Sequence, residues 1–210
     1  MSLASRRQVL KLLQLAGATA LLPRVLGCAP SVGLPLPRAR DGAWDAIVFN
    51  LARARQGAVP PAYLALIEGL GGIPQHLGKH LPFLVADGNL LDAALAANLL
   101  PIQWGDPGKG HARHPNAAPT EAVPSGHYYD WVDLLVGDAE TRVAFAPWPQ
   151  NRADVAGAYR GLRTDDPTGE EGRDTVYLLP MGGASCGVDV RVHGHCLTHG
   201  EYVDFVKVPG

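Results

Sequence analysis

The segment from Val188 to Val208 places the strongest constraint on what this chain can fold into. It opens with valines that alternate with polar side chains, VDVRVH over 188–193. This period of two residues is typical of a half-buried strand. The alternation breaks at Gly194, and a second β-rich run extends from Tyr202 to Val208. We therefore expect two neighbouring strands joined by a loop that carries Cys196 and His199.

The expected loop offers metal-binding groups. A thiolate and an imidazole three residues apart are common ligands at a common spacing. Histidines upstream extend the set of candidates: His76, His80, His111, His114 and His127. Pro74, Gly78 and Pro82 disfavour a long helix around the first two. Of these two, we expect His80 to point inward as the ligand candidate and His76 to lie at the surface.

Cys186 and Cys196 also allow a different interpretation. The chain holds three cysteines, and the third, Cys28, lies near the N-terminus. In an oxidising compartment Cys186 and Cys196 could form a hairpin disulfide, because they share the same parity in one strand region. The residue pattern leaves both interpretations open.

The first 28 residues resemble a bacterial export signal. Residues 5–11 (SRRQVLK) are similar to the twin-arginine motif, and the apolar run from Leu12 to Leu22 is too short to span a bilayer permanently. Residues 25–28 (VLGC) are similar to a lipobox. The resemblance implies a periplasmic protein, lipid-modified at Cys28, that contacts the membrane only through its signal or lipid anchor. Residues 29–40, rich in proline and glycine, are then a tether.

The charge balance argues against nucleic-acid binding. Lys and Arg together number 18, and Asp and Glu number 20. Four of the basic residues and none of the acidic ones fall in the first 27 positions, which leaves 14 basic against 20 acidic groups. Such a mildly acidic domain lacks the basic surface that binds phosphate backbones.

We expect residues 41–210 to form a single domain, helical over about 41–100 and β over about 101–210. Helices are predicted after an N-cap at Asp41, after Pro60-Pro61, and from Leu90 to Leu100. Residues 101–126 are predicted as a loop.

The remaining chain predicts an antiparallel sandwich. Strands are expected at 127–136, 141–148 and 174–179, in addition to the two C-terminal runs. Trp131 and Trp148 are predicted to lie in the core. His193 and His195 share parity with the polar residues of their strand, so both are predicted to face solvent.

Four segments, in order, resemble the superoxide reductases (desulfoferrodoxin and neelaredoxin). They are KHLP at 79–82, HPN at 114–116, HYYDWVDL at 127–134 and CLTHG at 196–200. The resemblance implies an immunoglobulin-like antiparallel β-sandwich, here with an added helical N-terminal part. It also implies one iron ion, cycling between Fe²⁺ and Fe³⁺, held by four histidines and one cysteine. Carried over by motif, the ligands are His80, His114, His127, Cys196 and His199.

This sequence departs from the family pattern in three places. Gly78 stands where the family has a glutamate two residues before the first histidine. The interval from His114 to His127 is longer, and the expected helices have no counterpart in the minimal members. His76 or His111 therefore stays open as a replacement for one of the ligands.

The resemblance implies an oxidoreductase that reduces superoxide to hydrogen peroxide. Lys79 would add positive potential for this small anion, and an external electron donor would re-reduce the iron. Two alternatives remain. One is a non-catalytic exported lipoprotein, for metal binding or for interaction, with a Cys186–Cys196 disulfide, and the other is the same iron site acting on a sulfur or nitrogen species. Assembly into a homo-oligomer stays open.

Overall fold

A computed structural model describes residues 33–146, 156, 159–160 and 171–210. The expected export signal, the lipidation site at Cys28 and Trp148 lie outside the described residues. Residues 33–40, expected to belong to a tether, contact the folded domain: the Arg191 guanidinium donates a hydrogen bond to the carbonyl of Pro37 at 2.9 Å.

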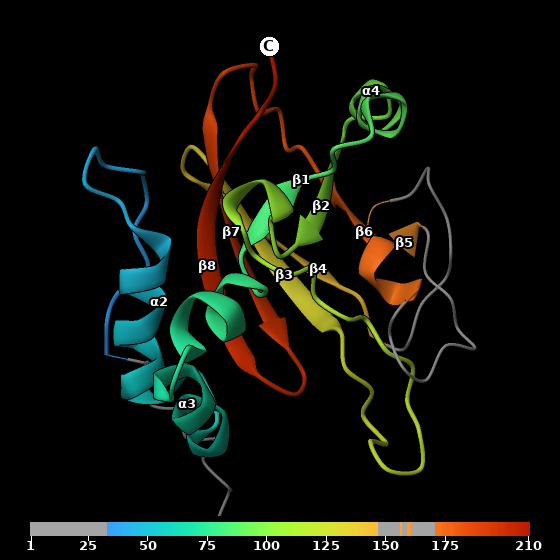
Figure 1. The fold of residues 1–210 in the computed structure, drawn as a ribbon. Helices are drawn as coiled ribbons and strands as arrows, with labels where there is room; N and C mark the ends of the chain where they lie inside the picture. The colour runs from blue at the N-terminus through green and yellow to red at the C-terminus, as the bar shows by residue number, and fades with distance from the viewer. Residues whose placement is uncertain (1–32, 147–155, 157–158, 161–170) are drawn as a thin grey trace, which may run out of the picture. The chain divides into compact units, whose positions relative to one another are not determined.

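Two four-stranded antiparallel sheets form the centre of the molecule (Figure 1). The first has the order β1-β2-β6-β5, with β1 at Pro82–Leu84, β2 at Leu99–Trp104, β6 at Val176–Pro180 and β5 at Tyr159–Arg160. The second has the order β4-β3-β7-β8, with β4 at Ala139–Ala144, β3 at Tyr129–Val136, β7 at Asp189–Cys196 and β8 at Gly200–Lys207. The predicted mainly β, antiparallel sandwich class is confirmed.

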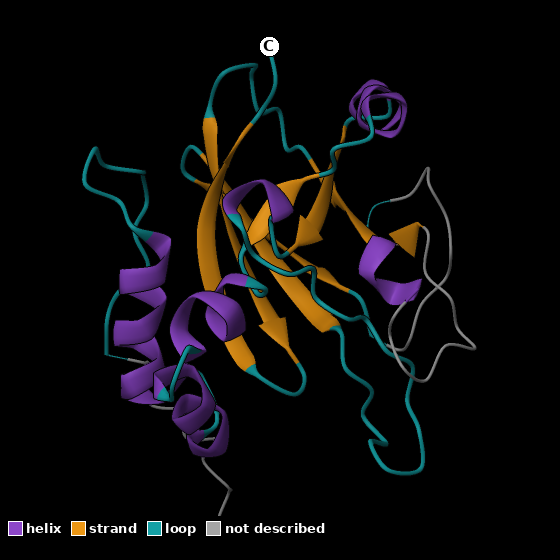
Figure 2. Ribbon diagram, in the orientation of Figure 1, coloured by secondary structure: helices purple, strands orange, loops and turns teal. Residues whose placement is uncertain are grey.

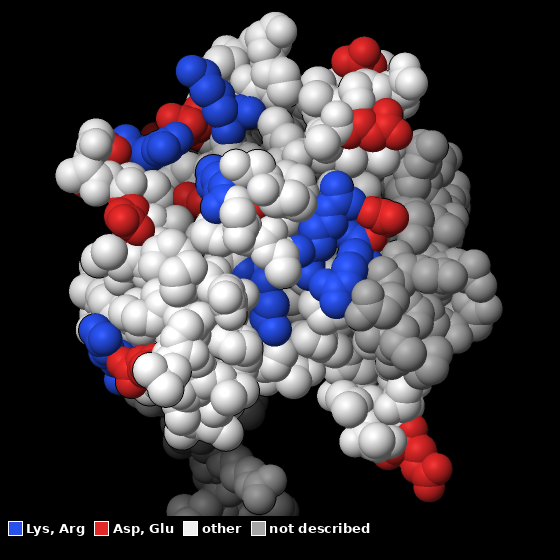
Figure 3. Space-filling model, in the orientation of Figure 1, with Lys and Arg blue, Asp and Glu red and all other residues white. Residues whose placement is uncertain are grey.

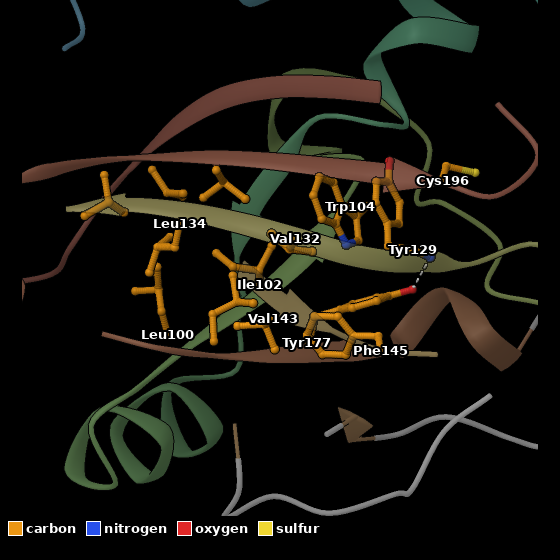
Figure 4. Packing of buried hydrophobic residues seen from close by; sticks show 14 of the residues in the cluster. Leu100, Ile102, Trp104, Tyr129, Val132, Leu134, Val143, Phe145, Tyr177 and Cys196 are labelled. Atoms are coloured by element: carbon orange, nitrogen blue, oxygen red, sulfur yellow. Dashed lines mark hydrogen bonds between the residues drawn. The ribbon is translucent and has the colours of Figure 1, made fainter. Parts of the chain in front are cut away.

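The main core lies between the two sheets (Figure 4). Alternate residues of β2 and β6, such as Ile102 and Tyr177, lie in the same core cluster as alternate residues of β3 and β7, such as Val132 and Val192. The other face of the first sheet packs against α4, at Gly88–Ala96. Its contributing side chains are Leu99, Val176 and Leu178. β2 and β6 are therefore buried on both faces, which explains why β2 shows no alternation of polar and apolar residues.

Of the other helical segments, drawn in purple in Figure 2, four precede the first strand in the described part of the chain and two lie between strands. They are α2 at Ala46–Arg53, η1 at Ala54–Ala58, α3 at Pro61–Glu68 and η2 at Ile73–Leu77, followed later by η3 at Pro107–Lys109 and η4 at Glu171–Asp174. Within the described part of the chain no helix is both long and apolar enough to cross a membrane.

The helical segments cover the free edge of β8. The side chain of Asn50 in α2 donates to the carbonyl of Val203 at 2.6 Å and accepts from its N–H at 2.8 Å. Because an unpaired strand edge exposes backbone groups that invite aggregation, this pairing protects the sheet. The helical part is thus bound to β8, the strand that begins one residue after His199.

Several predicted boundaries were wrong. The cap of α2 is Asp45, which accepts from the Val48 N–H, and not Asp41. The third helix, predicted from Leu90 to Leu100, begins at Gly88 after a cap at Asp87 and ends at Ala96. The segment expected to complete that helix and open a loop is β2, whose six residues are all buried. Pro101 and the absence of alternation concealed this strand in the sequence.

Gly194 does not interrupt β7, contrary to the prediction. The strand passes through it and pairs with both β3 and β8. A Cβ atom at this position would lie 2.4 Å from the Trp104 ring and 2.7 Å from Tyr129. The two rings stack on each other with centroids 3.6 Å apart. The glycine therefore makes room for a stacked aromatic pair beside Cys196 in the core.

His193 was predicted to face solvent, and this prediction was wrong because the residue is buried. Its parity is opposite to that of the core valines, yet its residue is only 5% exposed. Its Nε2 lies 3.0 Å from the Glu201 carboxylate, and its Nδ1 lies 3.6 Å from that of Asp133. His195 is half-buried, with Nδ1 2.6 Å from Asp130. Trp131, predicted in the core, is half-buried on this polar face beneath the Arg142 guanidinium.

We predict that Asp133 gives this polar face a measurable pH dependence. Burial raises its pKa, but hydrogen bonds from Arg142 and His193 outweigh it and lower the pKa to about 2. The stabilisation is therefore complete above the ordinary carboxyl pKa near 4 and is lost as pH falls through about 2. Asp133→Asn should lower the free energy of unfolding by about 2 kcal/mol at pH 7.

Urea unfolding at several pH values measures this effect. The difference between wild type and Asp133→Asn should shrink towards pH 2. The exposed Asp138 on the β3–β4 turn gives a control variant, Asp138→Asn, whose effect should stay within about 0.5 kcal/mol. A constant difference for Asp133→Asn across the pH range would contradict the prediction.

Candidate metal centre

Five side chains converge at one end of the sandwich: His80, His114, His127, Cys196 and His199. One potential ligand atom from each lies within 4.8 Å of all the others. These are the five residues that the sequence motifs selected, although they span 120 positions of the chain. The arrangement can hold a metal ion.

Two of the histidines are fixed by local turns and by hydrogen bonds to the ring. His80 follows η2, and its Nδ1 lies 2.9 Å from the carbonyl of His76. His114 follows η3, its backbone N–H donates to the carbonyl of Trp104 at 2.9 Å, and its Nδ1 lies 3.3 Å from Oδ1 of Asn116. Both rings are fully buried.

The remaining ligands come from β3 and the β7–β8 hairpin. His127 lies before β3 and is held by two backbone hydrogen bonds to Ala117, each 3.0 Å. Cys196 ends β7, and His199 lies in the three-residue connection to Gly200, which opens β8 with a φ of +86°. Glycine is needed there, because a Cβ would also lie 2.2 Å from the Ala58 carbonyl.

The hydrogen bonds direct nitrogen lone pairs into the centre. The carbonyl of His76 can only accept, so Nδ1 of His80 carries the proton and Nε2 presents a lone pair. Asn116 donates its amide to the carbonyls of His114 and Gly172, which leaves its oxygen to accept from Nδ1 of His114. Neighbouring groups thus fix the tautomer of two rings, as they do in metal sites.

The ring of His199 lies close to two other nitrogens of the cluster. Nδ1 of His199 lies 3.0 Å from Nε2 of His80 and also 3.0 Å from Nε2 of His127. Because Nδ1 of His199 carries at most one proton and Nε2 of His80 carries none, these two contacts cannot both be full hydrogen bonds at once. A metal ion could accept the lone pairs of all three nitrogens.

Burial keeps the histidines neutral. It lowers the pKa of His127 to about 4 and that of His199 to about 3, and it lowers the pKa of His80 and His114 well below the ordinary value. Neutral imidazole is the form that binds metals.

The thiol of Cys196 is deeply buried. Burial raises its pKa to about 12, although backbone N–H groups of Thr198 and His199 act in the opposite direction. Sγ lies 3.5 Å from Nε2 of His114 and 3.9 Å from Nδ1 of His199. A coordinated metal ion displaces the proton of such a thiol.

Aromatic side chains that the motifs did not indicate enclose the centre. Tyr63 of α3 stacks on His199 with centroids 3.8 Å apart, and its hydroxyl donates to the carbonyl of His76 at 2.8 Å. Tyr202 stacks on His80 at 4.3 Å and donates to the carbonyl of His199 at 2.8 Å. The sequence predicted a helix after Pro60-Pro61, where Tyr63 lies, but nothing in the sequence indicated that Tyr63 contacts His199.

The centre is less shielded on one side. His127 and His199 are half-buried, whereas the other three side chains are fully buried. Lys79 is also half-buried, with Nζ 5.6 Å from the centroid of the Tyr63 ring. Its charge lowers the pKa of all five residues, which adds to the effect of burial on the four histidines and opposes the effect of burial on Cys196. Lys79 therefore contributes positive potential at the cluster.

The structure does not contain the Cys186–Cys196 disulfide that the sequence left open. Cys186 and Cys196 are both free, and Cys186 is exposed. The register explains this, since Cys196 is at the far end of β7 from the turn that carries Cys186.

His76 and His111 do not belong to the cluster. The ring of His111 instead fills the space beside Gly78, where a Cβ would lie 2.2 Å from its Nδ1. A glutamate at position 78 could not be accommodated unless His111 moved.

Comparison with protein-family models, curated proteins and solved structures finds no match. The case for this centre therefore depends on the arrangement of its own residues. Imidazole and thiolate groups select iron, zinc, copper and similar ions over magnesium and calcium.

We predict that His114→Ala abolishes tight binding of a divalent transition metal, whereas His111→Ala retains it. The first substitution removes a buried nitrogen donor, and the second removes an imidazole outside the cluster. The affinity for the metal should fall at least about tenfold in His114→Ala, as it does when metal sites lose a supporting residue. In His111→Ala the affinity should fall by less than about threefold. Competition with a chromophoric chelator measures both values. Equal losses in the two variants would contradict the assignment.

Proposed function

We propose that this protein is a mononuclear non-haem iron oxidoreductase that reduces superoxide to hydrogen peroxide. The observation that carries the proposal is the set of one thiol and four imidazole nitrogens within 4.8 Å of one another. Structural zinc sites are almost always complete with four ligands, so a set of five favours another metal. Iron is the candidate that also matches the ordered motifs in the sequence.

The chain's own residues suit a small anionic substrate. Four neutral imidazoles and one thiolate leave a ferrous ion with one net positive charge. Lys79 adds positive potential on the half-buried side, which attracts an anion. Cys196 lies on the fully buried side, where solvent and oxidants do not reach its sulfur.

The proposed reaction takes one electron and two protons for each superoxide converted to hydrogen peroxide. Iron held by His80, His114, His127, Cys196 and His199 would supply the electron, through oxidation from the ferrous to the ferric state. An external donor then returns the electron. Tyr63 and Tyr202 hold the rings of His199 and His80 in place by stacking, which preserves the ligand geometry between the two states.

The visible spectrum tests the metal and its sulfur ligand. Oxidised wild-type protein with one iron per chain should show a thiolate-to-iron charge-transfer band. Cys196→Ser should lose this band, and Cys186→Ser, at an exposed free cysteine, should retain it. Rapid mixing of the reduced protein with superoxide should then give a second-order rate constant on the order of 10⁸ M⁻¹s⁻¹.

Other outcomes would overturn the proposal at different steps. Absence of iron after expression in iron-rich medium would remove the iron centre. Iron with the expected band but no reaction with superoxide would direct attention to sulfur or nitrogen species.

Lys79→Met tests the electrostatic contribution separately. We predict that the rate constant for superoxide falls about tenfold and becomes less dependent on ionic strength, because long-range attraction is lost. Lys207→Met, at the distal end of β8, is the control and should leave the rate unchanged. An unchanged rate in Lys79→Met, with the charge-transfer band intact, would exclude this role.

A further inference from the structure

The second feature of interest is a cavity that lies away from the candidate metal centre. The cavity has a volume of about 480 Å³ and opens between β1, η3 and the end of β8. None of the five candidate ligands lines it. Its volume is within the range of about 300–1,000 Å³ that is typical of small-molecule sites.

Basic side chains dominate the charged lining of this cavity. Arg40, Lys109, Arg113 and Lys207 face it, against one carboxylate, that of Asp106. Figure 3 shows that Lys and Arg side chains gather across the middle of this face of the molecule. This local excess of positive charge contrasts with the domain as a whole, which carries more acidic than basic residues.

Most of this positive charge is not neutralised by close pairing. Arg40 lies 3.8 Å from Asp189, and Lys109 lies 3.9 Å from Asp106, both near the limit for an ion pair. Lys207 forms no ion pair with any residue that the structure describes. Exposed pairs of this kind contribute little energy, so the cations remain available to a ligand.

The one carboxylate of the lining is already engaged. Oδ1 of Asp106 accepts a hydrogen bond from the N–H of Gly108 at 2.8 Å and caps η3. Arg113 pairs with Asp174, whose carboxylate is 75% exposed and does not line the cavity. An anion in the cavity would therefore meet little repulsion.

The rest of the wall is largely apolar. Phe83 of β1 and Phe205 and Val206 of β8 line the cavity while keeping only 6–8% of their surface exposed. A ligand that consists only of an inorganic anion would leave this surface without a partner. The wall instead suits a molecule that carries an apolar group beside its negative charge.

We propose that this cavity binds a small organic anion with an apolar body, such as an aromatic or aliphatic carboxylate, sulfonate or phosphate. The cations at the rim pair with the acidic group, and Phe83, Phe205 and Val206 contact the apolar body. The concave shape favours a small molecule over the flat acidic surface of another protein. This site is independent of the proposed iron chemistry.

The fluorescent probe 8-anilinonaphthalene-1-sulfonate tests the proposal, because it joins a sulfonate to an aromatic body. Titration of the folded full-length protein should give saturable fluorescence with one site per chain. The double variant Arg40→Glu/Lys207→Glu should weaken binding at least tenfold. Lys207→Gln alone, at an exposed position, should weaken it about threefold and provides a second variant that does not endanger folding.

Two controls separate this site from general hydrophobic binding. The uncharged analogue N-phenyl-1-naphthylamine should bind at least tenfold more weakly to wild type. Arg55→Glu reverses an exposed charge outside the cavity and should leave the dissociation constant of the sulfonate unchanged. Equal binding of both probes, or undiminished binding in the folded double variant, would overturn the proposal. Activity towards superoxide does not enter these measurements.

Discussion

The organisation of this protein depends on the convergence of four imidazoles and one buried thiol at one end of the sandwich. Desolvation forces the imidazoles to be neutral and the thiol to be protonated in the absence of a cation. A group of neutral imidazoles and one thiol, with two contacts between ring nitrogens at 3.0 Å, can hold a metal ion. The fold meets this constraint by bringing two turns, one strand entry and one hairpin to the same end of the sandwich.

The helical part is structurally connected to this cluster. Through Asn50 it completes the backbone pairing of Val203 in β8, and through Tyr63 it covers the ring of His199. Both contacts involve the chain near the hairpin that supplies two of the five candidate ligands. The helices therefore act as a second wall of the centre as well as covering the edge of the sheet.

The fold class and the membership of the cluster could be predicted from sequence because both are encoded in local patterns. Alternation in 188–193 indicated a strand, and four short motifs in order indicated the converging residues. The features that were missed depend on tertiary neighbours. β2 is buried on both faces and contains Pro101, so it lacked every local sign of a strand. His193 has the parity expected of a surface residue, but Glu201 and Asp133 bury it. Gly194 resembled a break because the stacked rings that require it come from Trp104 and Tyr129, far away in the chain.

The close approach of Gly200 to Ala58 has a dynamic consequence. The ligand-bearing hairpin and the helical segment touch through backbone atoms, with no side chain between them to absorb a displacement. Neither can open locally unless the other also moves, so the two belong to one cooperative unit. A metal ion that restrained Cys196 and His199 would consequently also slow amide hydrogen exchange in helices that contribute no ligand of their own.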